Sequence, residues 1–190
     1  MLVQSSESEL VTRALQRDGA AWEALVQMHQ EPVFRLSYLL LGDADEAEDN
    51  SQETFLRAYY ALDRYDLERP LKPWLLTIAG NLARNRRRSL GRYFGALQRL
   101  WQSDPRHSTT VEERSQQRSQ SQSLWQAVQR LQPDHQQVIY LRFFLELSVE
   151  ETAEALGTAP GTVKSRLHRA IDRLRQVIDA EFPGLKEFLE

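Results

Sequence analysis

The fold of the C-terminal part is decided by residues 147–167, which read LSVEETAEALGTAPGTVKSRL. Ser148 and Glu151 form the Ser-x-x-Glu pattern of a capping box, which predicts a helix starting directly after the serine. Gly157 suits the left-handed conformation that ends a helix, and Pro160 suits the first turn of the next one. The stretch therefore predicts two helices joined by a very short turn, which is the layout of a helix-turn-helix.

The second helix of this pair has two chemically distinct faces. Its apolar residues recur at helical spacing and should face a core: Val163, Leu167, Ala170, Ile171 and Leu174. The other side carries hydroxyls and cations: Thr162, Lys164, Ser165, Arg166 and Arg169. Such groups near a helix N-terminus can bond phosphates and base edges, so we expect this face to contact DNA. The alternative is a solvated helical hairpin whose cations are ordinary surface residues. It is disfavoured because the cap, the turn and the cationic face occur together at the spacing of a helix-turn-helix.

The composition favours a folded all-α protein and excludes several kinds of site. Helical periodicity dominates, and strand-like alternation is scarce. Cysteine is absent, which excludes disulfides and thiolate zinc sites. The four histidines are His29, His107, His135 and His168. They lie far apart in the sequence without the spacing of metal ligands, so we expect no metal and no cofactor. There is no membrane-length apolar run and no N-terminal signal pattern, so we expect a cytoplasmic protein without membrane insertion.

The net charge of −3 conceals a strong asymmetry along the chain. Residues 1–63 contain twelve acidic residues and four arginines. Residues 82–100 contain six arginines and no acid, and residues 161–175 contain five cations and one aspartate. Two basic patches beside an acidic part suggest nucleic acid as one partner and protein as another.

Apolar spacing predicts four helices within residues 7–90. The second contains Pro32, which should kink or split it, and the fourth begins within residues 70–73. Between about residues 91 and 123 serine and glutamine dominate, with little to bury.

We therefore expect an all-α chain of two small helical domains. The first covers residues 5–92, and the second covers residues 124–180 and contains the helix-turn-helix. Residues 93–123 should form a flexible Ser/Gln-rich linker between them.

Four motifs in order carry a resemblance to a known family. They are residues 45–58 (DEAEDNSQETFLRA), 73–85 (PWLLTIAGNLARN), 131–142 (LQPDHQQVIYLR) and 161–166 (GTVKSR). With these motifs the chain resembles the extracytoplasmic-function (ECF) RNA polymerase sigma factors of the sigma-70 family, the compact type with regions 2 and 4. The resemblance covers nearly the whole chain.

The resemblance implies roles for residues whose chemistry is suitable. Asp49, Gln52 and Glu53 would bind the polymerase core, and their spacing places them on one helix face, whereas Phe55, Leu56 and Tyr59 should pack inside. The −10 element would be contacted by a base-capturing loop and the helix after it: Tyr65, Arg69, Lys72, Asn81, Arg84, Asn85, Arg87 and Arg88. The −35 element would be contacted by the cationic face of the helix-turn-helix: Thr162, Lys164, Ser165, Arg166 and Arg169.

Four features depart from the family pattern, and one of them is Thr152, which stands where isoleucine is frequent. The loop of residues 65–72 lacks the common glycine, which leaves its preferred base open. Gly80 stands where relatives often carry arginine, and it weakens the helix by ~1 kcal/mol relative to alanine. Ala159 stands where a capping serine is frequent.

The resemblance implies a promoter-specificity subunit rather than an enzyme. Its partners would be core RNA polymerase and promoter DNA, it would be a monomer when free, and an anti-sigma protein is a further possible partner. A stand-alone helix-turn-helix regulator would explain residues 124–178 but neither the acidic face at Asp49 nor the arginine-rich helix. A metal-dependent nuclease is disfavoured because the acidic clusters lack accompanying residues at metal-site spacing.

Overall fold

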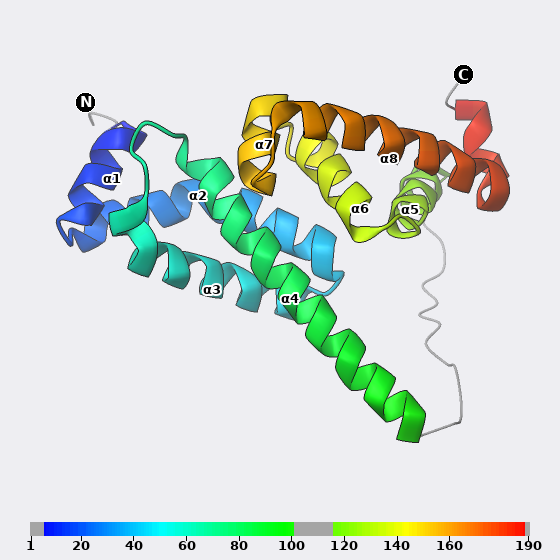
Figure 1. Cartoon of the computed structure of the whole chain (residues 1–190), viewed down its shortest axis with the longest axis horizontal. Helices are drawn as coiled ribbons and strands as arrows, with labels where there is room; N and C mark the ends of the chain where they lie inside the picture. The colour runs from blue at the N-terminus through cyan, green and yellow to red at the C-terminus, as the bar shows by residue number, and fades with distance from the viewer. Residues whose placement is uncertain (1–5, 101–115, 189–190) are drawn as a thin grey trace.

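A computed structural model describes the backbone of residues 6–100 and 116–188, and the side chains of residues 6–87 and 123–185. All regular structure in these ranges is helical (Figure 1). The elements are α1 (Glu7–Leu15), α2 (Gly19–Leu41), α3 (Ala44–Ala61), η1 (Leu62–Arg64), α4 (Leu71–Leu100), α5 (Gln116–Gln129), α6 (Pro133–Ile139), the π-helical turn η2 (Tyr140–Phe144), α7 (Val149–Leu156), α8 (Pro160–Glu181) and η3 (Pro183–Phe188).

The N-terminal domain consists of α1 to α4, which pack mainly through leucine and alanine side chains. Capping residues set the starts of its helices: the side chain of Asp18 accepts hydrogen bonds from two amides of α2, and that of Asp43 accepts one from α3. Buried Asn50 ties three helices together, since its amide donates to the Ser37 hydroxyl (2.9 Å) and the Ala79 carbonyl (3.2 Å). This polar contact fixes α4 against α2 and α3.

The split given as one alternative for Pro32 does not occur, and the burial expected for Leu56 is wrong. Pro32 does not split the second helix, since α2 runs without a break from Gly19 to Leu41; packing along α2 outweighs the loss of one backbone hydrogen bond. Leu56 was expected inside, but it is 51% exposed, while its neighbour Phe55 is buried. Position 56 falls on the outer side of α3, where helical geometry places every residue about 100° from the next.

Helix α4 is longer than its apolar pattern suggests, since it continues to Leu100. Of the expected linker at 93–123, residues 93–100 and 116–123 are helical, and residues 101–115 lie outside the described part of the chain.

The C-terminal domain contains the expected helix-turn-helix, formed by α7 and α8. The Ser148 hydroxyl accepts from the Glu151 amide (3.1 Å), and the Glu151 carboxylate accepts from the Ser148 amide (2.7 Å), so the capping box is complete. Gly157 ends α7 in the left-handed conformation with φ of 60°, and Pro160 opens α8. Ala159 contributes no side-chain cap, as its position predicted.

An aromatic cluster forms part of the core beneath the helix-turn-helix. The ring of Trp125 stacks on that of Tyr140 with centroids 5.6 Å apart, and Phe144 contacts both rings edge-on. Of the predicted inward face of α8, Val163 and Ala170 are fully buried, whereas Leu167, Ile171 and Leu174 are only partly buried.

The two domains lie directly against each other along α4 and α7 (Figure 1). At this contact the Thr77 hydroxyl donates to the Glu154 carbonyl (3.3 Å). Figure 1 also shows α6 and α7 between α8 and the N-terminal domain, so α8 lies on the outer side. Among the residues described, none of the helices is long and apolar enough to cross a membrane.

Candidate polymerase and DNA interfaces

The acidic face of α3 is open to solvent. Asp49 is 67% exposed, Gln52 is exposed and Glu53 is partly exposed, as their spacing predicted. Two of them make contacts within α3: Gln52 donates to the Glu48 carboxylate (3.3 Å), and Glu53 pairs with Arg57 (2.6 Å). Surface pairs of this kind contribute little to stability, so these side chains remain available to a partner.

Arg86 connects this face to the arginine-rich helix. Its guanidinium lies 2.6 Å from the Glu46 carboxylate and 3.6 Å from that of Asp49, so it joins α4 to the first half of α3. Arg86 belongs to the arginine-rich segment of residues 82–100. In the structure it acts as a positioning residue for the acidic face, and only tertiary contact reveals this.

The loop before α4 is held in shape by its own side chains and by Trp74 in the first turn of α4. The Tyr65 ring packs on Trp74 with centroids 5.0 Å apart, and the Tyr65 hydroxyl donates to the Arg69 carbonyl. Burial raises the pKa of Tyr65 to about 12, so this hydroxyl stays protonated and can act as a donor at neutral pH. The Arg69 side chain pairs with Asp66 (3.2 Å) and is otherwise largely exposed, whereas Lys72 is half-buried.

Glu7 and His29 attach this loop to the rest of the domain. One oxygen of the Glu7 carboxylate lies 2.9 Å from Nε2 of His29, and the other accepts from the Leu71 amide (3.3 Å) at the start of α4. The His29 ring is buried, and desolvation lowers its pKa despite the neighbouring carboxylate. The end of the loop is therefore fixed to α1 and α2 where α4 begins.

Helix α4 presents two different surfaces beyond its core side. Asn81 and Asn85 are exposed and share one face, on which Arg88 would fall by its register; the Arg88 side chain is outside the described residues. Arg84 and Arg87 lie on an adjacent stripe that faces the C-terminal domain. There the Arg84 guanidinium donates to the Gln137 side-chain oxygen (2.7 Å).

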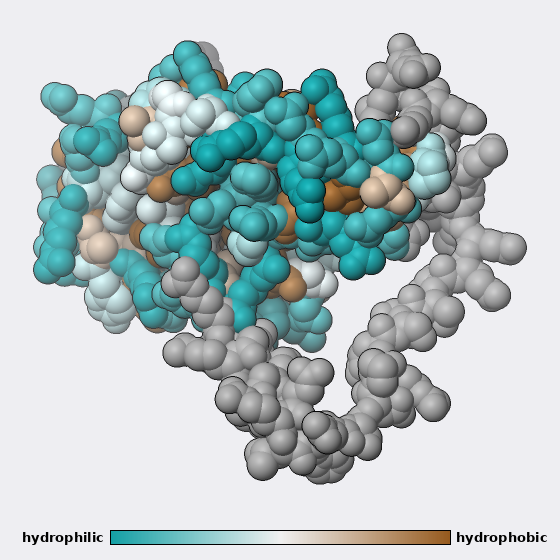
Figure 2. Space-filling view, turned by 45° about the vertical axis from the view of Figure 1, so that its right-hand side comes forward, coloured by the Kyte–Doolittle hydropathy of each residue, from teal (hydrophilic) through white to brown (hydrophobic). Residues whose placement is uncertain are grey.

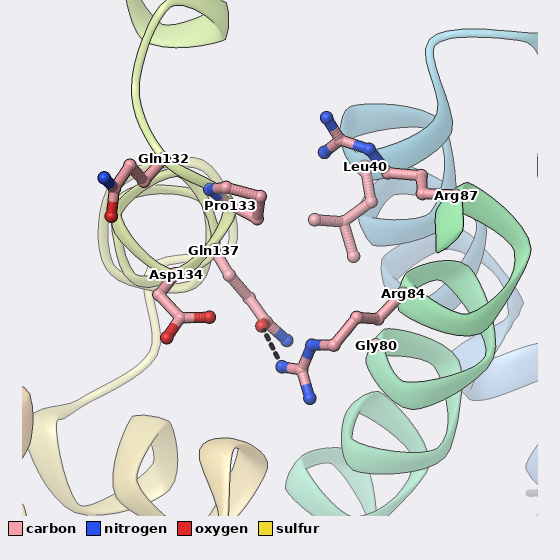
Figure 3. A pocket seen from close by; sticks show the side chains of 8 residues that line it. All are labelled: Leu40, Gly80, Arg84, Arg87, Gln132, Pro133, Asp134 and Gln137. Carbon is pink, nitrogen blue, oxygen red and sulfur yellow. Dashed lines mark hydrogen bonds between the residues drawn. The ribbon is translucent and has the colours of Figure 1, made fainter. Parts of the chain in front are cut away.

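A cavity of about 460 Å³ lies between α4 and α6 at this stripe (Figure 3). In Figure 3, Arg84 and Arg87 extend from α4 on one side, and Gln137 and Asp134 extend from α6 on the other. The second arginine also has a partner, since Arg87 donates to the Gln136 side-chain oxygen (3.1 Å). The structure thus brings two predicted DNA-binding cations onto the surface between the domains.

The cationic face of α8 is open to solvent, unlike Arg84 and Arg87 of α4, which bond to side chains of α6. Lys164, Ser165 and Arg169 are exposed, and Thr162 and Arg166 are partly exposed. Their contacts lie within the helix itself: Arg169 donates to the Ser165 carbonyl (3.2 Å), and Ser165 donates to the Thr162 carbonyl (3.1 Å). Figure 2 gives a second view of the molecule, in which hydrophilic residues cover most of the described surface and apolar residues show only as small separate patches.

Within the described side chains, no group of three or more His, Asp or Glu could hold a metal ion. The chain thus combines an exposed acidic face, an arginine-bearing helix and a helix-turn-helix with an open basic face.

Comparison with known proteins places this arrangement in a family. Residues 25–93 match the family Sigma-70 region 2, and residues 121–174 match the family Sigma-70, region 4. The ECF RNA polymerase sigma factor SigW of Bacillus subtilis is 32% identical over 167 residues, which cover 84% of this chain and 89% of SigW. The chain belongs to the ECF sigma factors of the sigma-70 family.

Two solved structures resemble this ECF sigma factor. CnrH, in complex with the cytosolic domain of CnrY, has a TM-score of 0.69 and 23% identity, covering 93% of this chain and 99% of CnrH. RpoE of Bartonella quintana, in complex with the anti-sigma factor NepR, has a TM-score of 0.61 and 26% identity, covering 84% of this chain and 97% of RpoE. The likeness to CnrH confirms the all-α fold.

Sequence reasoning missed Gln136 and Gln137 of this sigma factor. Both are buried although they are polar, and both contact arginines about fifty residues earlier in the chain. A pair of adjacent glutamines has no distinctive spacing, so only the domain contact makes them notable.

Proposed function

We propose that this ECF sigma factor binds core RNA polymerase through Asp49, Gln52 and Glu53. These side chains are at least partly exposed and lie on one face of α3; Gln52 and Glu53 make contacts within the helix, and Asp49 lies 3.6 Å from Arg86 of α4. A surface with carboxylates and an amide suits arginine-rich partner helices. Arg86 and Glu46 hold the supporting helices together behind it.

The −10 element is assigned to the N-terminal domain, within residues 5–92. The amides of Asn81 and Asn85 can bond base edges. The charges of Arg84, Arg87 and Arg88 can neutralise phosphates. Together these groups suit a melted DNA strand, which presents both bases and phosphates. The packed loop with Tyr65, Arg69 and Lys72 would receive a base flipped out of the duplex.

The −35 element is assigned to α8 in the C-terminal domain, within residues 124–180. Its N-terminal turns carry Thr162, Lys164, Ser165, Arg166 and Arg169 without competing ion pairs to other elements among the described residues. A helix-turn-helix places this part of its second helix in the major groove.

The observation that carries the proposal is the presence of an open helix-turn-helix and an exposed acidic face on the same chain. A stand-alone regulator needs only the helix-turn-helix. The proposed factor makes no covalent bond itself, acts in the cytoplasm where polymerase acts, and is a monomer when free. An anti-sigma protein is proposed as a further partner, supported by the RpoE–NepR complex of a relative.

The proposal is tested by DNA selection with purified components. A library of bacterial genomic fragments is incubated with the chain alone, with core polymerase alone and with both, and retained fragments are sequenced. We expect two short motifs at fixed spacing only when both proteins are present, because each domain alone has a small footprint. Equal enrichment by the chain without polymerase would instead support a stand-alone regulator.

A further inference from the structure

We propose that Glu7 of α1 is a positioning residue for the capture of a flipped base by the loop before α4. This inference rests on the proposed function, because it concerns the loop assigned there to the −10 element. Glu7 precedes residues 25–93, the part of the chain that matches Sigma-70 region 2, so the family match gives it no role.

The Glu7 carboxylate bridges two segments that are distant in the sequence. One of its oxygens lies 2.9 Å from Nε2 of His29 on α2, and the other accepts from the Leu71 amide at 3.3 Å. The His29 side chain is 7% exposed and Leu71 is fully buried, so packing fixes both partners. Figure 1 shows the loop passing beside α1 before it enters α4. The carboxylate therefore ties the end of the loop to two helices at once.

The residue before α4 cannot cap this helix with its side chain. The first amides of a helix have no partner within it, and a preceding Ser, Thr, Asp or Asn usually accepts a hydrogen bond from one of them. Pro70 stands at this place, and its side chain has no acceptor. Glu7 supplies the oxygen from another helix, and its negative charge suits the positive end of the helix dipole.

The two acidic residues in the first turn of α1 have separate tasks. Glu9 completes a capping box, since its carboxylate accepts from the Ser6 amide (3.0 Å) and the Ser6 hydroxyl accepts from the Glu9 amide (3.2 Å). Glu7 has no part in this box, and its carboxylate contacts α2 and the start of α4 instead. The start of α1 is thus set without Glu7, whose side chain is left to hold the loop.

The anchored end of the loop adjoins the side chains proposed to receive a base. Lys72 follows Leu71 directly, and at the other end the Tyr65 ring packs on the first turn of α4 while its hydroxyl donates to the Arg69 carbonyl. A loop fixed at both ends has less freedom to lose when it closes around a base, so capture costs less free energy. Loss of Glu7 should therefore weaken base capture and leave core binding unchanged.

The first test measures the mobility of the loop in the free, full-length chain. Because the chain has no cysteine, a nitroxide label can be attached through Leu67→Cys, an exposed position in the loop. Its electron paramagnetic resonance spectrum should show a more mobile label when Glu7→Ala is added. Glu7→Gln should keep the original spectrum, because the amide retains an oxygen for Leu71 and a second polar group for His29. Glu7→Asp should not, because the shorter side chain cannot reach both partners.

Two controls separate the order of the loop from general effects. Glu9→Gln removes the same charge from the same turn but keeps the capping box, since glutamine also serves there, and it should leave the label at position 67 unchanged. A label attached through Tyr60→Cys, an exposed position on α3, should report no change on Glu7→Ala. Circular dichroism checks that each variant is folded.

The second test measures base capture with core polymerase on a promoter obtained by the DNA selection above. 2-Aminopurine is placed in turn at each −10 position of the non-template strand, and its fluorescence rises at the captured base, where stacking is lost. Glu7→Ala should shorten the lifetime of the open complex by roughly three- to tenfold, while the affinity for core stays unchanged. On DNA with an abasic site at the captured position, Glu7→Ala and the unsubstituted chain should form equally stable open complexes.

The proposal would be overturned by equal label mobility in Glu7→Ala and the unsubstituted chain. A loss of open-complex lifetime that persists in full on the abasic DNA would also overturn it, because Glu7 would then support the domain rather than base capture. Label mobility is measured without polymerase, so failure there leaves the sigma-factor assignment standing. If the selection instead yields no polymerase-dependent promoter, the proposed function fails, and base capture fails with it whatever the label shows.

Discussion

Removing two side chains from the acidic face of α3 should uncouple this sigma factor from polymerase without unfolding it. In the double variant Asp49→Ala/Gln52→Ala, the losses within the domain are small. The Asp49 carboxylate lies 3.6 Å from Arg86, and Arg86 keeps its closer partner Glu46 at 2.6 Å when Asp49 is removed. Gln52 loses one exposed hydrogen bond of 3.3 Å to Glu48. Exposed contacts of this kind are each worth roughly 0.2–1 kcal/mol, so the loss of two should lower the free energy of unfolding by roughly 0.4–2 kcal/mol.

The loss at the interface should be larger. A hydrogen bond to a charged group contributes roughly 1.5–3 kcal/mol, and a neutral one about 1 kcal/mol. Together the two side chains should cost about 2.5–4 kcal/mol of binding free energy, which weakens the dissociation constant for core by roughly 70- to 800-fold.

The assay titrates fluorescently labelled sigma factor with purified core polymerase and follows anisotropy, with circular dichroism as the check on folding. Glu23→Ala, which removes an exposed carboxylate from α2, is the charge-matched control and should bind like the unsubstituted chain. The assignment of this face would be refuted if the double variant kept normal helicity and bound core within about threefold of the unsubstituted chain.

Three further predictions follow from the local structure. Ser148→Ala removes the cap of α7 and should lower the free energy of unfolding by about 1 kcal/mol, seen as a lower urea midpoint; an unchanged midpoint would contradict the capping argument. Because burial lowers the pKa of His29, the unfolded chain takes up the proton first, so stability should fall as pH drops through about 6.5. His29→Gln should flatten this fall in urea titrations between pH 7.5 and 5.5, whereas His168→Gln, with an exposed ring, should retain it. Arg166→Ala should reduce the transcription advantage of a matched over a scrambled −35 element by roughly tenfold while core affinity stays unchanged; an unaltered ratio would exclude a base contact.

Local chemistry made the helix-turn-helix predictable from the sequence. The Ser148–Glu151 box, the left-handed Gly157 and the opening Pro160 each act within a few residues, and the structure contains all three. The inward face of α8 was predictable for the same reason, since burial follows helical spacing.

Features that depend on distant contacts were not predictable. The exposure of Leu56 depends on how α3 is rotated against α2 and α4, and the unbroken α2 at Pro32 depends on packing along the helix. The role of Gly80 is the clearest case: in the sequence it is a weak point in a helix, and in the structure it lies against Gln137, nearly sixty residues later. The positions that bind polymerase and DNA stay predictions, supported by their exposure and charge.

The most direct test of the central claim is transcription in vitro with purified bacterial core polymerase and a genomic fragment library, with and without this chain. The account predicts discrete start sites that appear only when the chain is added, preceded by two short elements at constant spacing. Core polymerase that initiates at the same sites in its absence, or no initiation together with no binding of the chain to core, would contradict it.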